Sequence, residues 1–215
     1  RRGTDETGAK RAKKADGKRD YDHFTLIAKN LQGWQNLQRL ASIASLEGFY
    51  YKPRMSWALL TKYHEGLIAL SGCLSGQLSN SLKVGKTEEA EAHARRWKDL
   101  FGDDYYVELQ PVVEGAGELH ARLAVDQAKA NDGCLAIAKK LGIKTVATAD
   151  VHYVEPDDAA IQEVKICVNA YATLAENRAS GLNMPPVFYF KSSEEMQKLF
   201  RHYPEAALAT REIAD

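Results

Sequence analysis

Four short apolar segments, separated by stretches with helical periodicity, constrain the fold of this chain more than any other feature. They are Phe24–Ala28, Leu67–Ser71, Tyr105–Leu109 and the run that begins at Lys144. Each has the length and the apolar or β-branched content of a buried strand. The resulting order, βαβαβαβ, predicts a parallel sheet, open or closed into a barrel, with its functional groups at the carboxyl ends of the strands.

Apolar spacing predicts the helices between these strands at Leu31–Leu46, Met55–Tyr63, Thr87–Phe101 and Glu118–Leu141. In the third of them, Ala90, Ala94, Trp97 and Phe101 recur on one side and form the expected buried face. Thr87 is the expected cap of that helix, and Gly102 its end. The fourth helix contains a weak point at residues 131–133, where Asn, Asp and Gly occur together.

The C-terminal part has a different pattern. A helix is expected over Pro156–Asn169, above the functional site, and Leu182–Phe190 is expected to end in a short strand. Ser192 and Glu195 have the spacing of a capping box, and Pro204 suits the first turn of a last helix. We expect these helices to pack outside the sheet or to begin a connection to another domain.

Composition and charge indicate a globular chain without a strong electrostatic signature. Of the 215 residues, 45% are hydrophobic, and 29 Lys and Arg balance 29 Asp and Glu. No apolar run is long enough to span a membrane, so no membrane partner is expected. The three cysteines are far apart, which indicates a reducing, cytoplasmic setting. Residues 1–20 lack apolar periodicity and are interpreted as a disordered basic arm or insertion. The chain does not begin with Met, and we expect it to be part of a longer protein.

Candidate ligands follow the strand ends. His23 enters the first strand, Cys73 follows the second, and Asp150 and His152 close the fourth. Alternate strand residues point to one side, so Asp150 and His152 could address one metal ion or one phosphate. Imidazole, thiolate and carboxylate are ligands for zinc, manganese or iron. Taken singly, Asp150 equally suits a helix cap, Cys73 a small buried hydrophobe, and Glu108, at the end of the third strand, a salt bridge.

Several spaced motifs resemble one family. They are Asp22–Asn30, Gly33–Leu37, Leu46–Arg54, Glu65–Leu74, Val146–Tyr153, Lys191–Met196 and Pro204–Leu208. In this order they are similar to the PHP (polymerase and histidinol phosphatase) domain of bacterial DNA polymerase III alpha subunits. The segment Phe49–Arg54 resembles the replicative branch better than the error-prone one.

The resemblance implies a distorted (βα)7 barrel of PHP type that lacks its first strands here. It implies a PHP domain over residues 21–190 and a helical connection toward the polymerase palm over residues 191–215. Family metal ligands carry over onto His23, Cys73, Asp150 and His152, with zinc, manganese or iron as the ions. The parent protein would be a DNA polymerase that uses Mg, binds DNA and works with a sliding clamp and clamp loader.

The resemblance leaves three functions open. The domain could be a metal-dependent 3′–5′ exonuclease, a non-catalytic scaffold that stabilises the polymerase or binds a proofreading subunit, or a phosphoesterase similar to histidinol phosphatases. The isolated segment is expected to be inactive. Lys52 and Arg54, on either side of Pro53, could contact DNA phosphate, and an Arg after Pro equally suits bracing a loop.

Overall fold

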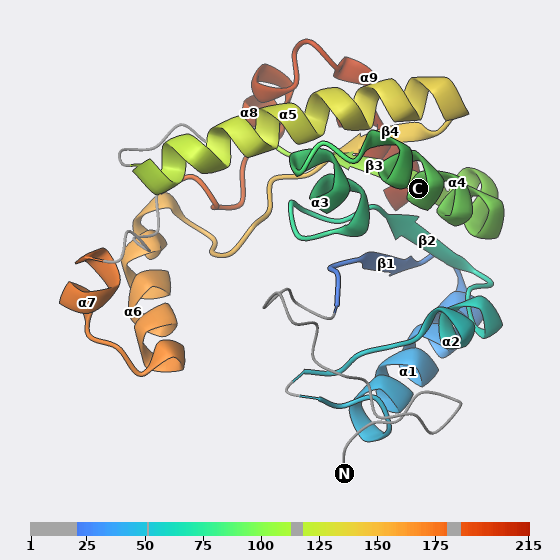
Figure 1. Ribbon diagram of the computed structural model, residues 1–215, viewed down its shortest axis with the longest axis horizontal. Helices are drawn as coiled ribbons and strands as arrows, with labels where there is room; N and C mark the ends of the chain where they lie inside the picture. Colours follow the sequence, from blue (N-terminus) through green and yellow to red (C-terminus); the bar gives the residue numbers. More distant parts are fainter. Residues whose placement is uncertain (1–20, 51, 113–117, 180–185) are drawn as a thin grey trace.

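The computed structural model describes residues 21–50, 52–112, 118–179 and 186–215, which form an α/β fold on a four-stranded sheet (Figure 1). The strands lie in sequence order, as β1 (Thr25–Ala28), β2 (Leu67–Leu70), β3 (Tyr105–Leu109) and β4 (Lys144–Ala147). All four predicted strands are confirmed. The sheet formed by the described residues is open, and closure into a barrel stays a prediction. The expected basic arm at residues 1–20 lies outside the described residues.

The prediction of an all-parallel sheet was wrong at β1. Strands β2, β3 and β4 are parallel, but β1 pairs antiparallel with β2, with Thr25 opposite Leu70 and Ala28 opposite Leu67. The backbone N–H of Lys29 donates to the carbonyl oxygen of Gly66 at 2.8 Å. The chain therefore leaves β1 and enters β2 at the same end of the sheet. Apolar periodicity indicates that helices intervene, but it does not indicate the end at which the chain returns.

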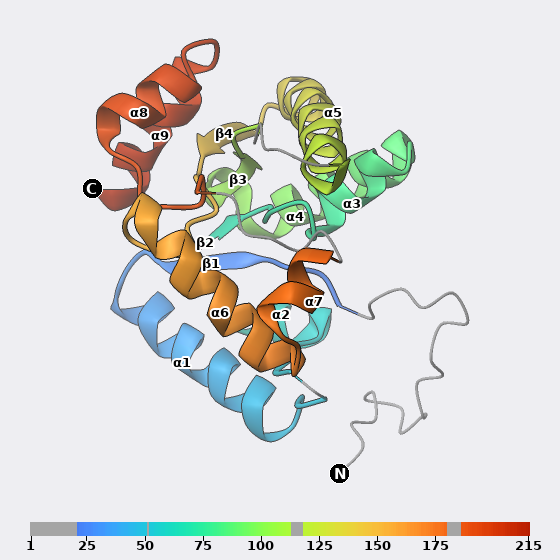
Figure 2. The same ribbon diagram turned by 90° about the vertical axis from the view of Figure 1, so that its left-hand side faces the viewer.

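Helices cover both faces of the sheet. The larger core lies on the face toward α3, α4 and α5, and the smaller one lies between the other face and α9 (Figure 2). Strand β2 contributes to both, because alternate residues point to opposite faces: Leu67 and Ala69 join the larger core, and Ile68 and Leu70 join the smaller. A strand buried on both faces has the continuous apolar sequence seen here.

The helices are α1 (Leu31–Leu46), α2 (Trp57–Lys62), α3 (Gln77–Lys83), α4 (Thr87–Phe101), α5 (Glu118–Leu141), α6 (Ala159–Ala170), α7 (Leu174–Ala179), α8 (Ser193–Leu199) and α9 (Pro204–Ala214). Two 3-10 turns, η1 (Gly102–Asp104) and η2 (Pro156–Asp158), precede β3 and α6. The predicted helices are confirmed, including the buried face of α4 and its end at Gly102. Its cap is Lys86, not Thr87. Helix α5 is continuous through the expected weak point, where Gly133 lets it approach Leu82 of α3.

Two short helices, α3 and α7, were not predicted. The sequence of α3 is rich in Ser and Asn, which have low helix propensity. Its Leu78 and Leu82 are buried, and α3 packs against α4 and α5. Tertiary packing therefore stabilises this helix despite its composition.

Helix α1 packs on the sheet through a glycine and a polar residue as well as through Leu40 of its apolar stripe. Leu31 is 71% exposed, whereas Gly33 and Asn36 are buried. A Cβ atom on Gly33 would lie 1.7 Å from the carbonyl oxygen of Gly66, so only glycine permits this approach. Asn36 Nδ2 donates to the carbonyl oxygen of Glu65 at 2.9 Å.

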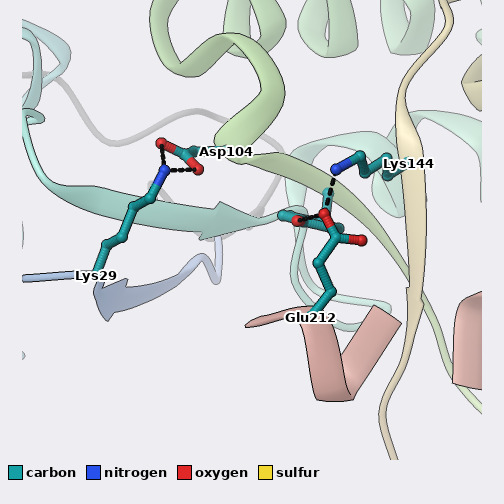
Figure 3. Close-up of polar contacts among 5 residues, drawn as sticks. Lys29, Asp104, Lys144 and Glu212 are labelled. Atoms are coloured by element: carbon teal, nitrogen blue, oxygen red, sulfur yellow. Dashed lines mark hydrogen bonds and ion pairs between the residues drawn. The ribbon is translucent and has the colours of Figure 1, made fainter. Parts of the chain in front are cut away.

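Helix α9 is fixed to the sheet by polar contacts as well as apolar ones. Lys144 of β4 forms an ion pair with Glu212, and Tyr106 Oη donates to the same carboxylate at 3.1 Å (Figure 3). Across the same end of the sheet, Lys29 Nζ lies 2.7 Å from Asp104 Oδ1. The predicted position of the last helices outside the sheet is confirmed for α9, and so is the capping box of α8.

The expected helix over the site has a different position. Helix α6 packs against η2 and α7 and stands apart from the sheet (Figure 1). Of the expected strand at Leu182–Phe190, residues 182–185 lie outside the described residues. The described part forms an isolated parallel bridge between Tyr189 and Tyr153. No helix in the described ranges combines the length and apolar content needed to cross a bilayer.

Candidate functional site

A cavity of about 830 Å³ opens at the edge of the sheet where β1 begins and β2, β3 and β4 end. Three of the four predicted metal ligands line it: His23, Cys73 and Asp150. Glu108 lines the same cavity, and the fourth predicted ligand, His152, does not. The structure therefore brings together imidazole, thiol and carboxyl groups from four different strand ends.

The antiparallel direction of β1 places His23 at this edge. In a parallel arrangement, a residue that precedes β1 would lie at the opposite edge from residues that follow β2. Here the pairing of Thr25 with Leu70 brings His23 Nδ1 to 3.5 Å from Cys73 Sγ. Gly72, with φ +83°, makes the turn out of β2, and its α-carbon faces the carbonyl oxygen of His23.

Asp150 and His152 do not share one side in the way that strand alternation predicted. Strand β4 ends at Ala147, and Asp150 has a left-handed backbone with φ +50°. His152 Nδ1 donates to the carbonyl oxygen of Asp150 at 2.6 Å, and its ring contacts Phe188 edge-on. This tautomer leaves the lone pair on Nε2 as the atom that could bind a metal.

Glu108 is a site residue that sequence reasoning set aside. The expected salt bridge was wrong: Glu108 is 7% exposed, and its Oε1 accepts hydrogen bonds from Thr148 Oγ1 at 2.5 Å and from Gln110 Nε2 at 2.9 Å. Its Oε2 is buried and has no hydrogen-bond partner among the described residues. The available signal was its position at the carboxyl end of a central strand, where sites of α/β proteins gather.

Burial and neighbouring acids set the electrostatics of the cavity. Burial raises the pKa of the Cys73 thiol, and the negative charges of Asp150 and Glu108 raise it further. Burial likewise raises the pKa of Glu108, with a smaller contribution from Asp150. These shifts favour the neutral forms and indicate that the site lacks positive charge close to its acidic groups.

The types of ligand group in the cavity suit a divalent cation, but too few of these groups lie close together. Thiolate, imidazole and carboxylate are the ligands of zinc and related ions, and Oε2 of Glu108 is a buried oxygen without a partner in the described part of the chain. Within the described ranges, however, no three His, Cys, Asp or Glu side chains lie close enough to bind one ion. A complete centre would need a movement of His152 or ligands from other residues.

The predicted nucleic-acid contacts, Lys52 and Arg54, line the same cavity. The Arg54 guanidinium lies 4.8 Å from the ring centroid of Tyr21 and 4.9 Å from that of Tyr50. Lys52 is exposed, with Nζ 6.0 Å from the Tyr21 ring. Arg54 is thus braced by aromatic rings, and Lys52 has more freedom to meet an anion.

Comparison with known proteins identifies the family of this chain. The sequence model of the PHP domain family matches residues 6–111. Relatives called DNA polymerase III subunit alpha come from Treponema pallidum, Deinococcus radiodurans and Saccharopolyspora erythraea, and are 41%, 40% and 37% identical. The matches cover 91%, 87% and 100% of this chain, but only 16%, 13% and 17% of the relatives.

This match shows the class, with which the α/β fold is consistent: the chain carries a PHP domain. More narrowly, it belongs to the family of bacterial DNA polymerase III alpha subunits. It spans less than a fifth of the length of the relatives that it matches.

Proposed function

We propose that this chain is the PHP portion of a replicative DNA polymerase III alpha subunit, and that its cavity is a metal-dependent 3′–5′ exonuclease site. The observation that carries the proposal is the convergence of His23, Cys73 and Asp150 on one cavity from separate strand ends. The family relationship supports the parent protein, a DNA polymerase that uses Mg, and its expected partners, DNA, a sliding clamp and a clamp loader. On the same ground we propose the cytoplasm as its location.

The side chains have distinct roles in this proposal. His23 Nδ1, Cys73 Sγ and an Asp150 oxygen would hold divalent cations, with His152 Nε2 joining after its segment moves. Bound cations would lower the pKa of a water and stabilise charge on the phosphoryl oxygens. Cys73 must lose its proton to bind, and its raised pKa means that metal affinity should fall as the pH is lowered. Zinc, manganese and iron all suit this donor set.

Lys52 and Arg54 are proposed to bind DNA phosphate at the entrance of the cavity. Both side chains line the same cavity as the acidic residues. One phosphodiester strand could therefore contact Lys52 and Arg54 as well as the metal ligands. Their contacts would position the strand without reading its sequence.

One observation favours a second function, that of a non-catalytic scaffold. His152 lies outside the cavity, and its Nδ1 is bonded to the backbone of its own loop. A site that has lost its metals would keep such a geometry, and the domain would then stabilise the polymerase or bind a proofreading subunit.

We propose the boundaries 21–190 for the domain and 191–215 for its helical connection under either function.

The test uses the full-length subunit and the double change Asp150→Ala, His152→Ala. Metal content and release of nucleotides from a DNA 3′ end are measured, with polymerisation as the control for folding. The matched control variant is Asp157→Ala, His202→Ala, because both of these residues are exposed and neither lines the cavity.

The exonuclease proposal expects the double change to remove bound metal and nucleotide release while polymerisation persists. The control variant should retain all three. If the wild-type subunit holds no metal in this domain, or if the double change alters only stability or partner binding, the scaffold function replaces the exonuclease.

A further inference from the structure

The guanidinium group of Arg96 lies against the ring of Trp57 on the wall of the cavity. The distance from Arg96 Cζ to the ring centroid is 3.6 Å. At this distance the guanidinium must lie nearly flat on the ring, because an edge-on group would push a nitrogen atom into it. Both residues line the cavity, Trp57 from the start of α2 and Arg96 from α4. The cavity wall therefore holds a positive charge at a defined place.

Arg96 has no acidic partner in the described ranges of the chain. It is exposed, and the ion pairs of the described residues do not include it. The preceding residue, Arg95, pairs with Glu91 at 3.0 Å. A guanidinium carries five N–H donors in its plane. Because the Trp57 ring covers only one face of Arg96, the donors at the edge of the guanidinium stay available for an anion.

A series of aromatic rings anchors Arg96 to the core. The Trp57 ring meets Trp97 edge-on, with centroids 4.6 Å apart, and Trp97 stacks on Phe24 at 4.0 Å. Trp97 is 8% exposed and belongs to the larger core. An arginine held on a fixed ring loses less conformational freedom when it binds an anion than a free arginine does. The arrangement of Arg96 thus suits binding as well as bracing.

Arg96 adds a third cation to the cavity wall that already includes Lys52 and Arg54. Trp57 follows Arg54 by three residues, so their Cα atoms are at most about 11 Å apart. A small anion needs one such cation, whereas a chain of phosphodiesters can contact several. Aromatic rings between cations are typical of sites for single-stranded nucleic acid, where bases stack and phosphates pair with positive charges. Tyr21 and Trp57 supply such rings here.

We propose that Arg96 is a further phosphate-binding residue of this cavity, and that its ligand is the backbone of a single DNA strand. The edge of the guanidinium donates to phosphoryl oxygens, and Trp57 holds the group in position. The contact binds the strand without reading its sequence. This inference rests on the proposed function as far as DNA binding in the cavity, and requires neither a bound metal nor nuclease activity.

The experiment is Arg96→Gln in the full-length subunit. A short single-stranded oligonucleotide that carries 5-iodouracil is crosslinked by light to nearby aromatic side chains, and peptide mass spectrometry locates the products on Tyr21 and Trp57. This readout separates the cavity from DNA sites elsewhere in the subunit. Titration of the oligonucleotide gives the half-saturating concentration, which should rise about 2- to 5-fold in the variant. The slope of its logarithm against the logarithm of salt concentration should fall by about 0.7, the value for one lost contact to a single strand.

Arg95→Gln is the matched control. It removes the same charge from the neighbouring position of α4, but Arg95 is paired with Glu91 and does not line the cavity. Its half-saturating concentration and its salt slope should equal those of the wild type.

A higher half-saturating concentration and a smaller salt slope in Arg96→Gln alone support the proposal. An unchanged half-saturating concentration refutes it. A rise with an unchanged slope also refutes it, because a displaced Trp57 without a lost phosphate contact would give that result. Equal effects of the two variants refute it as well, since only the overall charge of α4 would then matter.

The same measurement separates this inference from the exonuclease. Crosslinks on Tyr21 or Trp57 in a wild-type subunit that releases no nucleotides overturn the exonuclease and leave the comparison of Arg96 with Arg95 intact. A wild-type subunit without crosslinks at either ring overturns DNA binding in the cavity, and the role of Arg96 with it.

Discussion

Replacement of Gly72 by alanine should damage both the stability of the fold and the candidate site. Gly72 has φ +83°, a backbone conformation that is unfavourable for residues with a Cβ atom. A Cβ atom there would also lie 2.6 Å from the carbonyl oxygen of His23. The substitution therefore combines backbone strain with a steric clash against the residue that places an imidazole beside Cys73.

Gly85 separates these two effects. It has φ +78°, but nothing lies within 4 Å of the position of its added Cβ atom. Gly85→Ala should therefore cost only the backbone strain, about 1–2 kcal/mol. At Gly72 the His23 carbonyl must move by at least 0.4 Å, the difference between 3.0 Å and 2.6 Å. With an overpacking cost of about 1–3 kcal/mol, we expect Gly72→Ala to lose about 2–5 kcal/mol in total.

Urea unfolding of both variants gives the two losses, and chelator competition gives zinc affinity. Gly72→Ala should bind zinc more weakly, since displacement of His23 alters its 3.5 Å approach to Cys73. Gly85→Ala should bind zinc as the wild type does. Equal unfolding free energies and equal zinc affinities for the two variants would refute this reasoning, because the contact between Gly72 and His23 would then have no effect.

Three further changes test other parts of the structure. The hydrogen bond from Lys144 lowers the pKa of Glu212 below its ordinary value of 4.5. The ion pair between Lys144 and Glu212 therefore stabilises α9 above pH 4.5, and this stabilisation is lost as the pH falls through the lowered pKa. Amide exchange in α9 should accelerate in acid in the wild type and depend less on pH in Glu212→Gln. Arg54→Lys should lower the unfolding free energy by about 1 kcal/mol, measured in urea, because lysine cannot stack between two tyrosine rings; an unchanged midpoint would contradict the bracing role. Asn36→Ala should cost about 0.5–1.5 kcal/mol by thermal unfolding, since it removes the hydrogen bond from the buried Asn36 amide to the Glu65 carbonyl oxygen; a loss near zero would show that water replaces the amide.

Local sequence patterns were sufficient to predict the buried residues of a helix or strand wherever one face of that element packs on an apolar core. Ala90, Ala94, Trp97 and Phe101 recur at helical spacing and form the buried face of α4 as predicted. The same rule was incomplete for α1, because its contact with the sheet includes a glycine and a buried amide beside the buried Leu40. Side-chain periodicity contains no information about such close backbone approaches.

The candidate site could be predicted in its residue types but not in its arrangement. The convergence of His23 and Cys73 depends on the direction of β1, which is a property of tertiary structure. The position of His152 depends on the left-handed backbone of Asp150, which strand alternation cannot predict. Glu108 differs from a surface glutamate only in its burial, and burial of a single polar residue follows from the assembled fold.

The antiparallel pairing of β1 with β2 also affects which insertions the protein can accept. The whole connection between these strands, residues 29–66, leaves and re-enters the sheet at the end opposite His23 and Cys73. Its outer turn carries Leu46, which is 84% exposed. Added residues at such an exposed turn cost little closure entropy. A long insertion after Leu46 would therefore leave the spacing of the two side chains intact. It would change the placement of Lys52 and Arg54, which line the cavity from the same connection, so variation here would alter the proposed phosphate contacts and not the candidate metal ligands.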